Sequence, residues 1–83
     1  MTATILPFPA FRRRELIGKI VRSALRMNAA AGEQHIRRSL DLQATVMRRK
    51  GIAEDLIAKE RIALESAVRQ AIWDAVMAPR GVR

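Results

Sequence analysis

Apolar residues recur at helical spacing in three stretches of the chain, residues 10–30, 33–50 and 53–78. Within each stretch they return every three or four positions, which gathers them on one face of a helix with 3.6 residues per turn. The first stretch has the cleanest apolar face, made of Leu16, Ile17, Ile20, Val21, Ala24 and Leu25. The second aligns Ile36, Leu40, Gln43 and Met47. The pattern predicts an all-α protein, a three-helix bundle spanning residues 10–78.

The third stretch is apolar on two opposite faces. One face carries Ile57, Leu64, Val68, Ala71, Ile72 and Ala75, and the other carries Ile62, Trp73 and Met77. A two-helix hairpin can bury only one such face. We therefore expect residues 53–78 to lie between the other two helices. Trp73 would then pack in the core, and the alternative is an exposed Trp73 that anchors a binding partner.

Glycine and asparagine mark the expected helix ends. Asn28 and Gly32 bound the predicted break between the first two helices, because both residue types are common at helix termini. Gly51 follows a basic helix end and should stop the second helix, with Ile52 as its apolar contact. The short link that follows predicts a long antiparallel helical hairpin. Gly18, inside the first helix, is either merely tolerated or allows a neighbouring helix to approach closely.

Residues 1–9 form a predicted extended arm, and residues 79–83 a short basic tail after Pro79. Pro7 and Pro9 fix their own backbone angles and disfavour helical angles in the residues before them. The arm presents three large apolar side chains: Ile5, Leu6 and Phe8. Two interpretations stay open, a disordered terminus and a strap that docks onto a groove.

Positive charge is concentrated in the first fifty residues. The net charge is +8, yet residues 51–83 contain equal numbers of basic and acidic residues. The first helix is basic on its polar side, where Lys19, Arg22 and Arg26 align near Arg12, Arg13 and Arg14. Such a stripe can follow phosphates. The chain lacks stacking aromatic residues and a distinct recognition helix, so the stripe is also typical of a solvated face or of a helix on an anionic membrane.

No set of residues indicates catalysis. The chain has no cysteine and a single histidine, His35, so no second imidazole or thiolate could share a metal ion with it. We therefore predict no enzyme activity, no cofactor and no metal site. No apolar run approaches the roughly 18 residues of a membrane span, and the two prolines interrupt any secretory signal. The expected location is cytoplasmic.

The segment Ile5-Leu6-Pro7-Phe8-Pro9 precedes Arg12-Arg13-Arg14, and the turn Arg48-Arg49-Lys50-Gly51 and a late Trp73 follow. This arrangement resembles a group of small alphaproteobacterial proteins of unknown function. The resemblance implies a bacterial, cytoplasmic helical protein and no particular activity. The chain is also similar in size and class to small helical antiactivators that sequester transcription regulators, but it shares no motif with them.

The sequence favours a non-enzymatic regulatory protein that docks onto another protein as a component of transcription control. The predicted contact residues are Ile5, Leu6, Phe8, Ile62, Trp73 and Met77. The alternative is an accessory protein that binds nucleic acid without sequence preference. Its predicted contacts are Arg12, Arg13, Arg14, Lys19, Arg22 and Arg26. A third reading is self-association into a homodimer through the third helix.

Overall fold

A computed structural model describes residues 10–77 of the protein, with side chains from Arg12 onward. This part contains three helices, α1 (Ala10–Leu25), α2 (Ala29–Arg49) and α3 (Glu54–Met77), and no strand. The predicted all-α, three-helix fold is therefore confirmed. The predicted arm and tail, residues 1–9 and 79–83, lie outside the described residues.

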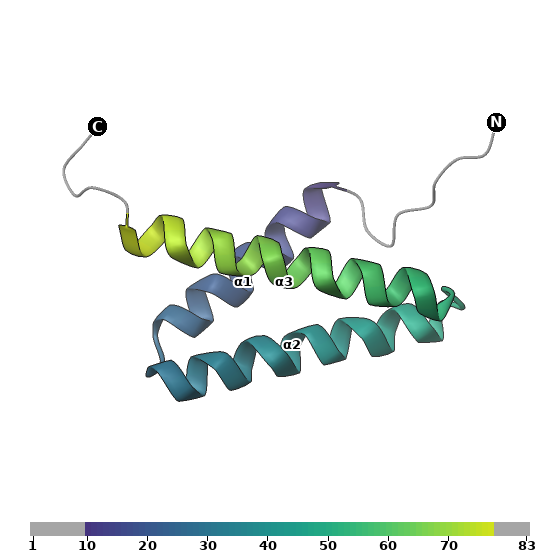
Figure 1. The fold of residues 1–83 in the computed structure, drawn as a ribbon, viewed down its shortest axis with the longest axis horizontal. Coiled ribbons are helices and arrows are strands. Elements are labelled where there is room, and N and C mark those ends of the chain that lie inside the picture. The colour runs from purple at the N-terminus through teal and green to yellow at the C-terminus, as the bar shows by residue number, and fades with distance from the viewer. Residues whose placement is uncertain (1–9, 78–83) are drawn as a thin grey trace.

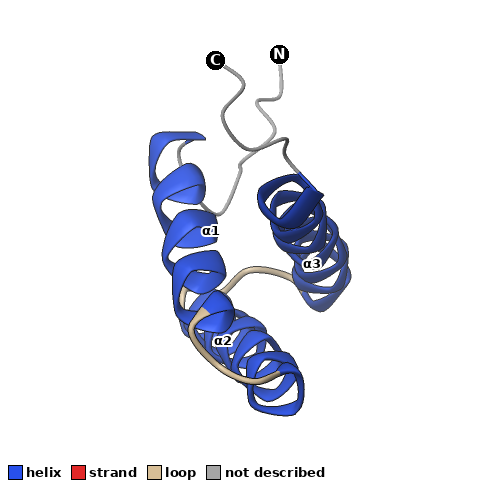
Figure 2. Ribbon diagram, turned by 90° about the vertical axis from the view of Figure 1, so that its left-hand side faces the viewer, coloured by secondary structure: helices blue, strands red, loops and turns tan. Residues whose placement is uncertain are grey.

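The helices α2 and α3 run antiparallel as a hairpin, and α1 crosses behind α3 (Figure 1). Each helix contacts both of the others. Viewed from one side, α1 and α3 lie next to each other, and α2 lies below both (Figure 2). The end of α1, the beginning of α2 and the end of α3 therefore meet at one end of the molecule, and the α2–α3 turn forms the opposite end.

The break between α1 and α2 is shorter and earlier than the sequence predicted. The N–H of Arg26 donates to the Ser23 carbonyl at 3.2 Å, and that of Met27 to the Ala24 carbonyl at 3.1 Å, which tightens and ends α1. Asn28 then acts as the N-cap of α2, because its side-chain oxygen accepts a hydrogen bond from the N–H of Ala31 at 2.8 Å. Asparagine suits either helix end, and the alanines that follow it are strong helix formers. The predicted start of the second helix at residue 33 was therefore four residues late.

Gly32 is a packing residue and not a helix end. It lies buried in the first turn of α2, facing α1. A methyl group added there would lie 3.1 Å from the backbone carbonyl oxygen of Ala24. Because no larger side chain fits without moving α1, Gly32 sets how closely the two helices approach.

The turn between α2 and α3 follows the sequence prediction. Gly51 has a left-handed backbone, with φ 81°. The N–H of Gly51 donates to the Arg48 carbonyl and that of Ile52 to the Met47 carbonyl, at 3.0 and 3.1 Å. This pair of hydrogen bonds defines a Schellman motif, in which glycine avoids the strain of a positive φ.

The core runs along the inner sides of all three helices. Its larger cluster joins Ile20, Val21, Ala24, Ile36, Leu40, Leu64 and Val68. A smaller cluster beside the α2–α3 turn joins Ala44, Met47 and Ile57, with Ile52 packed against it. The predicted apolar faces of α1 and α2 are therefore the buried ones, although Leu25 is half exposed and Ala44 replaces Gln43 as the buried residue of its turn.

α3 buries only one of its two apolar faces. α1 and α2 both pack on the face of Ile57, Leu64 and Val68, so α3 does not separate them. Ile62, Trp73 and Met77 are exposed, and the expectation that Trp73 lies in the core is wrong. Ala75 is exposed as well, because α3 is longer than α2 and its last turn extends past the beginning of α2 (Figure 1).

Candidate protein-binding surface

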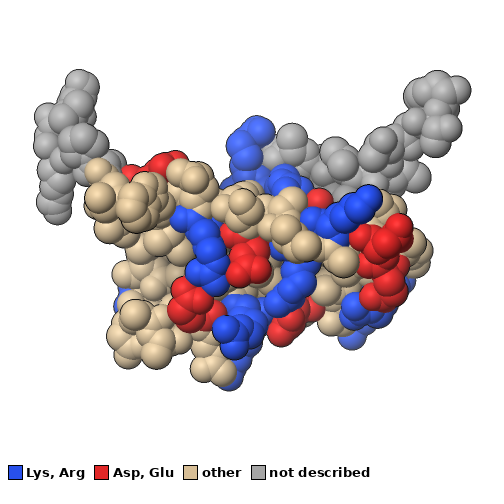
Figure 3. Space-filling view, viewed as in Figure 1, with Lys and Arg blue, Asp and Glu red and all other residues tan. Residues whose placement is uncertain are grey.

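Large apolar side chains lie exposed at the end of the bundle where α3 ends and α2 begins. Figure 3 shows this end as largely uncharged, whereas charged side chains cover the middle of the same face. Its most exposed members are Trp73, Val76 and Met77 of α3, at 61%, 63% and 56% exposure, and Leu25 and Met27 at the end of α1 are about half exposed. We call the surface formed by Leu25, Met27, Ile72, Trp73, Val76 and Met77 the Trp73 end.

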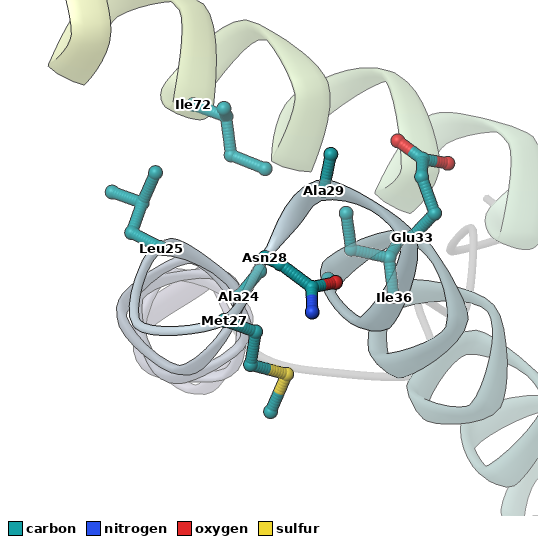
Figure 4. Close-up of a pocket in the computed structure, with 9 residues that line it drawn as sticks. Ala24, Leu25, Met27, Asn28, Ala29, Glu33, Ile36 and Ile72 are labelled. Atoms are coloured by element: carbon teal, nitrogen blue, oxygen red, sulfur yellow. The ribbon is translucent and has the colours of Figure 1, made fainter.

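Two adjoining hollows shape the Trp73 end. The first, of about 270 Å³, opens between the end of α1, the start of α2 and α3. Figure 4 shows Leu25 and Ile72 directed toward each other across it, with Ala29 and Ile36 of α2 beside them. The second hollow, also about 270 Å³, lies along α3 against Trp73, Val76 and Met77. Ile72 and Glu33 line both, so the two hollows are neighbours.

Arg69 and Glu33 form the polar side of the second hollow. The guanidinium of Arg69 donates two hydrogen bonds to Glu33 of α2, at 2.8 and 2.9 Å, and one to Glu65 of its own helix at 3.1 Å. The hydrogen bonds from Arg69 lower the pKa of Glu33, helped by the charges of Arg69 and Arg37. The same hydrogen bonds raise the pKa of Arg69. Glu33 is therefore held as an ionised carboxylate beside the apolar hollow, paired with the guanidinium of Arg69.

Ile62 does not belong to the Trp73 end, although the helical wheel places it on the same side of α3. It is 68% exposed, but eleven residues, or about 16 Å of helix, separate it from Trp73. Arg69 and Glu65 occupy the surface between them. The structure thus brings Trp73 and Met77 together and leaves Ile62 apart. The other predicted contacts, Ile5, Leu6 and Phe8, lie outside the described residues.

The basic side of α1 forms a second candidate surface, which lacks one predicted member. Arg13 is partly buried and pairs with Glu60 of α3, itself buried, so this arginine ties α1 to α3. The other predicted cations are exposed and have no ion-pair partner among the described residues: Arg12, Arg14, Lys19 and Arg22 on α1, and Arg26 just after its end. Gly18 contacts no neighbouring helix, because a methyl group there would meet only the guanidinium of Arg22.

Three ion pairs join α2 to α3, and sequence reasoning missed all of them. Besides Glu33–Arg69, Arg48 donates to Glu54 at 2.5 and 3.0 Å, and Arg61 lies 2.6 Å from Asp41. Arg48 lowers the pKa of Glu54 through its hydrogen bonds. The balanced charge of residues 51–83 was the available signal, since it supplies α3 with acids and bases that α2 can match. The pairing itself depends on the register of the two helices.

Potential metal ligands do not cluster on these surfaces in the described part of the chain. Within residues 12–77, no three histidine, aspartate or glutamate side chains converge as metal ligands. His35 is half-buried beside Met27 and Arg38 in a hollow next to the α1–α2 turn. None of the described helices is both long and apolar enough to cross a lipid bilayer.

Comparison with known proteins identifies a family and no activity. Searches among curated proteins and among solved structures gave no match. A family model described as "Family of unknown function (DUF6074)" matches residues 1–82, nearly the whole chain. This agrees with the resemblance to small proteins of unknown function, and the chain belongs to DUF6074.

Proposed function

We propose that this protein is a non-enzymatic regulator that docks onto another protein through the Trp73 end. The observation that carries the proposal is the exposure of Trp73 beside Val76 and Met77. Tryptophan is enriched among the residues that dominate binding energy at protein interfaces. Contiguous exposed apolar side chains are also unusual on a small monomer and mark interaction sites.

The setting that we propose is the bacterial cytoplasm, with transcription control as the regulated process. It follows from the resemblance of the arm and basic helix to small alphaproteobacterial proteins and from the size and class of the chain. In this proposal the arm side chains Ile5, Leu6 and Phe8 supply further contacts with the partner.

Affinity capture from a nuclease-treated bacterial lysate tests the docking proposal. The double variant Trp73→Ala/Met77→Ala should reduce the amount of captured partner at least tenfold, because losing an aromatic anchor typically costs about 2 kcal/mol or more of binding free energy. Leu42→Ala is the matched control, since Leu42 is an equally exposed apolar residue on α2, away from the Trp73 end. Equal capture by the wild type and the double variant would contradict the proposal.

The second candidate function is binding to nucleic acid through α1. The observation that favours it is the set of exposed α1 cations without a described acidic partner. When the capture is repeated without nuclease, Lys19→Ala/Arg22→Ala/Arg26→Ala should then abolish retention of DNA or RNA. The salt dependence of nucleic-acid binding should also become weaker, because binding through fewer cations releases fewer counterions from the nucleic acid. If nuclease treatment removes all captured protein and Trp73→Ala has no effect, this second function replaces the first.

A further inference from the structure

We propose that the Trp73 end receives an acidic amphipathic helix of a partner protein, with apolar side chains in the two hollows and carboxylates toward the α1–α2 turn. This inference rests on the proposed docking function and specifies the chemistry of the partner. The shape of the surface, the charges on its two sides and the net charge of the chain carry it.

The shape suits an apolar helix face. The two hollows are each about 270 Å³, adjoin at Ile72 and are lined mainly by aliphatic and aromatic carbon. Helices that dock in grooves insert apolar anchors spaced at i, i+3 or i+4, and i+7, so that successive anchors lie one turn apart. Two neighbouring hollows can take two such anchors, and the exposed ring of Trp73 can pack along the helix between them.

The charges on the α1–α2 side are positive. Arg26 lies in the turn between Leu25 and Met27 and is exposed. Met27 lines the first hollow on one side, and on the other side it lines a hollow that contains Arg38. Neither arginine has an acidic partner within ion-pair distance in the described part of the chain. Arg26 and Arg38 therefore both neighbour Met27, which lines the first hollow, and we infer that a bound helix reaches these two cations beyond Met27.

The charges on the α3 side differ. Glu33 is already neutralised by Arg69 through two hydrogen bonds. Asp74, next to Trp73, accepts a hydrogen bond from Gln70 and has no basic partner within ion-pair distance in the described part of the chain. The groove thus has a cationic edge on α1–α2 and an acid on α3, which orients the partner: its carboxylates must face Arg26 and Arg38 and avoid Asp74.

A second copy of this chain is the less favourable occupant. Each chain carries a net charge of +8, so two copies repel one another at long range, whereas an acidic partner is attracted. This long-range effect acts mainly on the rate of association and is screened beyond about 10 Å at 0.1 M salt. A difference in affinity requires ion pairs formed at the edge of the groove itself.

Two labelled helical peptides probe the groove. Both are about 18 residues long, since shorter isolated helices are marginal in water. Both carry leucine at i, i+3, i+4 and i+7, and they differ only in glutamate or lysine at the flanking positions. Fluorescence anisotropy with the full-length protein should show binding of the glutamate peptide at least tenfold tighter than that of the lysine peptide. Leu25→Ser/Trp73→Ser should weaken binding of the glutamate peptide at least tenfold. The control Leu42→Ser/Ile62→Ser should leave the affinity for this peptide unchanged.

Charge-reversal variants distinguish the effect of the cationic edge from the effect of the net charge of the protein. Arg26→Glu/Arg38→Glu should weaken binding of the glutamate peptide about tenfold or more, because each exposed ion pair is worth up to about fivefold in affinity. The same variant should bind the lysine peptide more tightly. Arg12→Glu/Lys19→Glu changes the net charge equally but lies further up α1, and it should have a several-fold smaller effect. Circular dichroism confirms that each variant keeps its helices.

Three results would overturn the inference: no preference between the peptides, equal effects of the two charge-reversal pairs, or a dimer that buries Trp73 when sedimentation is measured at the concentration of the binding assay. The proposed function fails separately. If Trp73→Ala/Met77→Ala still abolishes capture of the cellular partner while the peptides bind without preference, docking stands and only the acidic character of the partner is wrong.

Discussion

Two glycines inside helices play opposite roles at the scale of single residues. Gly18 and Gly32 both occupy helical positions, where glycine is less favourable than alanine by about 1 kcal/mol. At Gly18 a methyl group would meet only the flexible end of Arg22, whereas at Gly32 it would meet the backbone of Ala24, in each case at 3.1 Å. The side chain of Arg22 can swing into solvent, but a backbone carbonyl moves only with its helix.

Alanine substitution should therefore have opposite effects at the two sites. Gly18→Ala should raise the free energy of unfolding by about 0.5–1 kcal/mol through helix propensity. Gly32→Ala gains the same propensity but forces α1 and α2 apart, and overpacking costs about 1–3 kcal/mol, so we expect a net loss of about 1 kcal/mol. Urea unfolding followed by circular dichroism measures both. Equal stabilisation by the two substitutions would show that Gly32 does not limit helix approach.

Ion pairs fasten the α2–α3 hairpin along its exposed side at the scale of elements. Arg48–Glu54 lies beside the turn, Asp41–Arg61 midway, and Glu33–Arg69 near the Trp73 end. Exposed pairs contribute little individually, about 0–1 kcal/mol each. Because they recur along the interface, they favour one register of the two helices, and a shift of either helix by one turn would separate all three pairs.

The pairs make the stability of the hairpin depend on acid pH. Folding lowers the pKa of Glu33 and of Glu54 below the ordinary 4.5, because Arg69 and Arg48 donate hydrogen bonds to the ionised carboxylates. A carboxyl group with a lowered pKa stabilises the fold above its unfolded pKa, and this contribution is lost as pH falls through the folded value. The melting temperature should thus be level near neutral pH and fall below about pH 4.5.

Removing these two carboxylates should make that fall shallower. Glu33→Gln/Glu54→Gln should have a slightly lower melting temperature than the wild type at pH 7. Its melting temperature should also fall less than that of the wild type between pH 7 and pH 3, as measured by thermal unfolding. Glu15→Gln is the control, because Glu15 is exposed on α1 and has no ion-pair partner among the described residues. If the melting temperature of the double variant falls at acid pH as steeply as that of the wild type, other carboxylates cause the fall.

The whole molecule has a thin core that depends on all three helices. α1 contributes Ile20, Val21 and Ala24 to the larger cluster and covers Leu64 and Val68 of α3. Burying one such side chain is worth about 1.5–3 kcal/mol, so α1 supplies a large share of the stability of a chain this short. α1 therefore acts as the cover of the α2–α3 hairpin, and it leaves the outer face of α3 exposed.

Deleting residues 1–27 should expose the inner apolar face of the hairpin. The fragment retains the Asn28 cap, so its helices can begin normally, but Ile36, Leu40 and Leu64 lose their contacts with α1. We expect the fragment to associate and the full-length chain to sediment as a monomer at the same concentration. A monomeric, fully helical fragment would show that the hairpin is stable alone, and a tight full-length dimer would show that the Trp73 end binds a second copy.

Local sequence determined most of the fold. Apolar spacing predicted three helices and their inner faces, and Gly51 with Ile52 predicted the α2–α3 turn, because these features depend only on residues within a few positions of each other. The position of the α1–α2 break was harder to predict. Asn28 and Gly32 suit several places at a helix terminus, and only contact with Ala24 gives Gly32 its role.

Tertiary structure decided the surfaces. The wheel of α3 showed two apolar faces, but the packing of α1 and α2 on the same face left Trp73 and Met77 exposed and joined them to Leu25 and Met27 of another element. Likewise, Arg13 looked like its neighbours in sequence until the register placed it against Glu60. The sequence alone thus determined the helices and which residues could be buried. Only the packing of the helices decided which side chains remained at the surface and next to what, because contacts between distant residues depend on register and crossing, and neither is encoded in a local pattern.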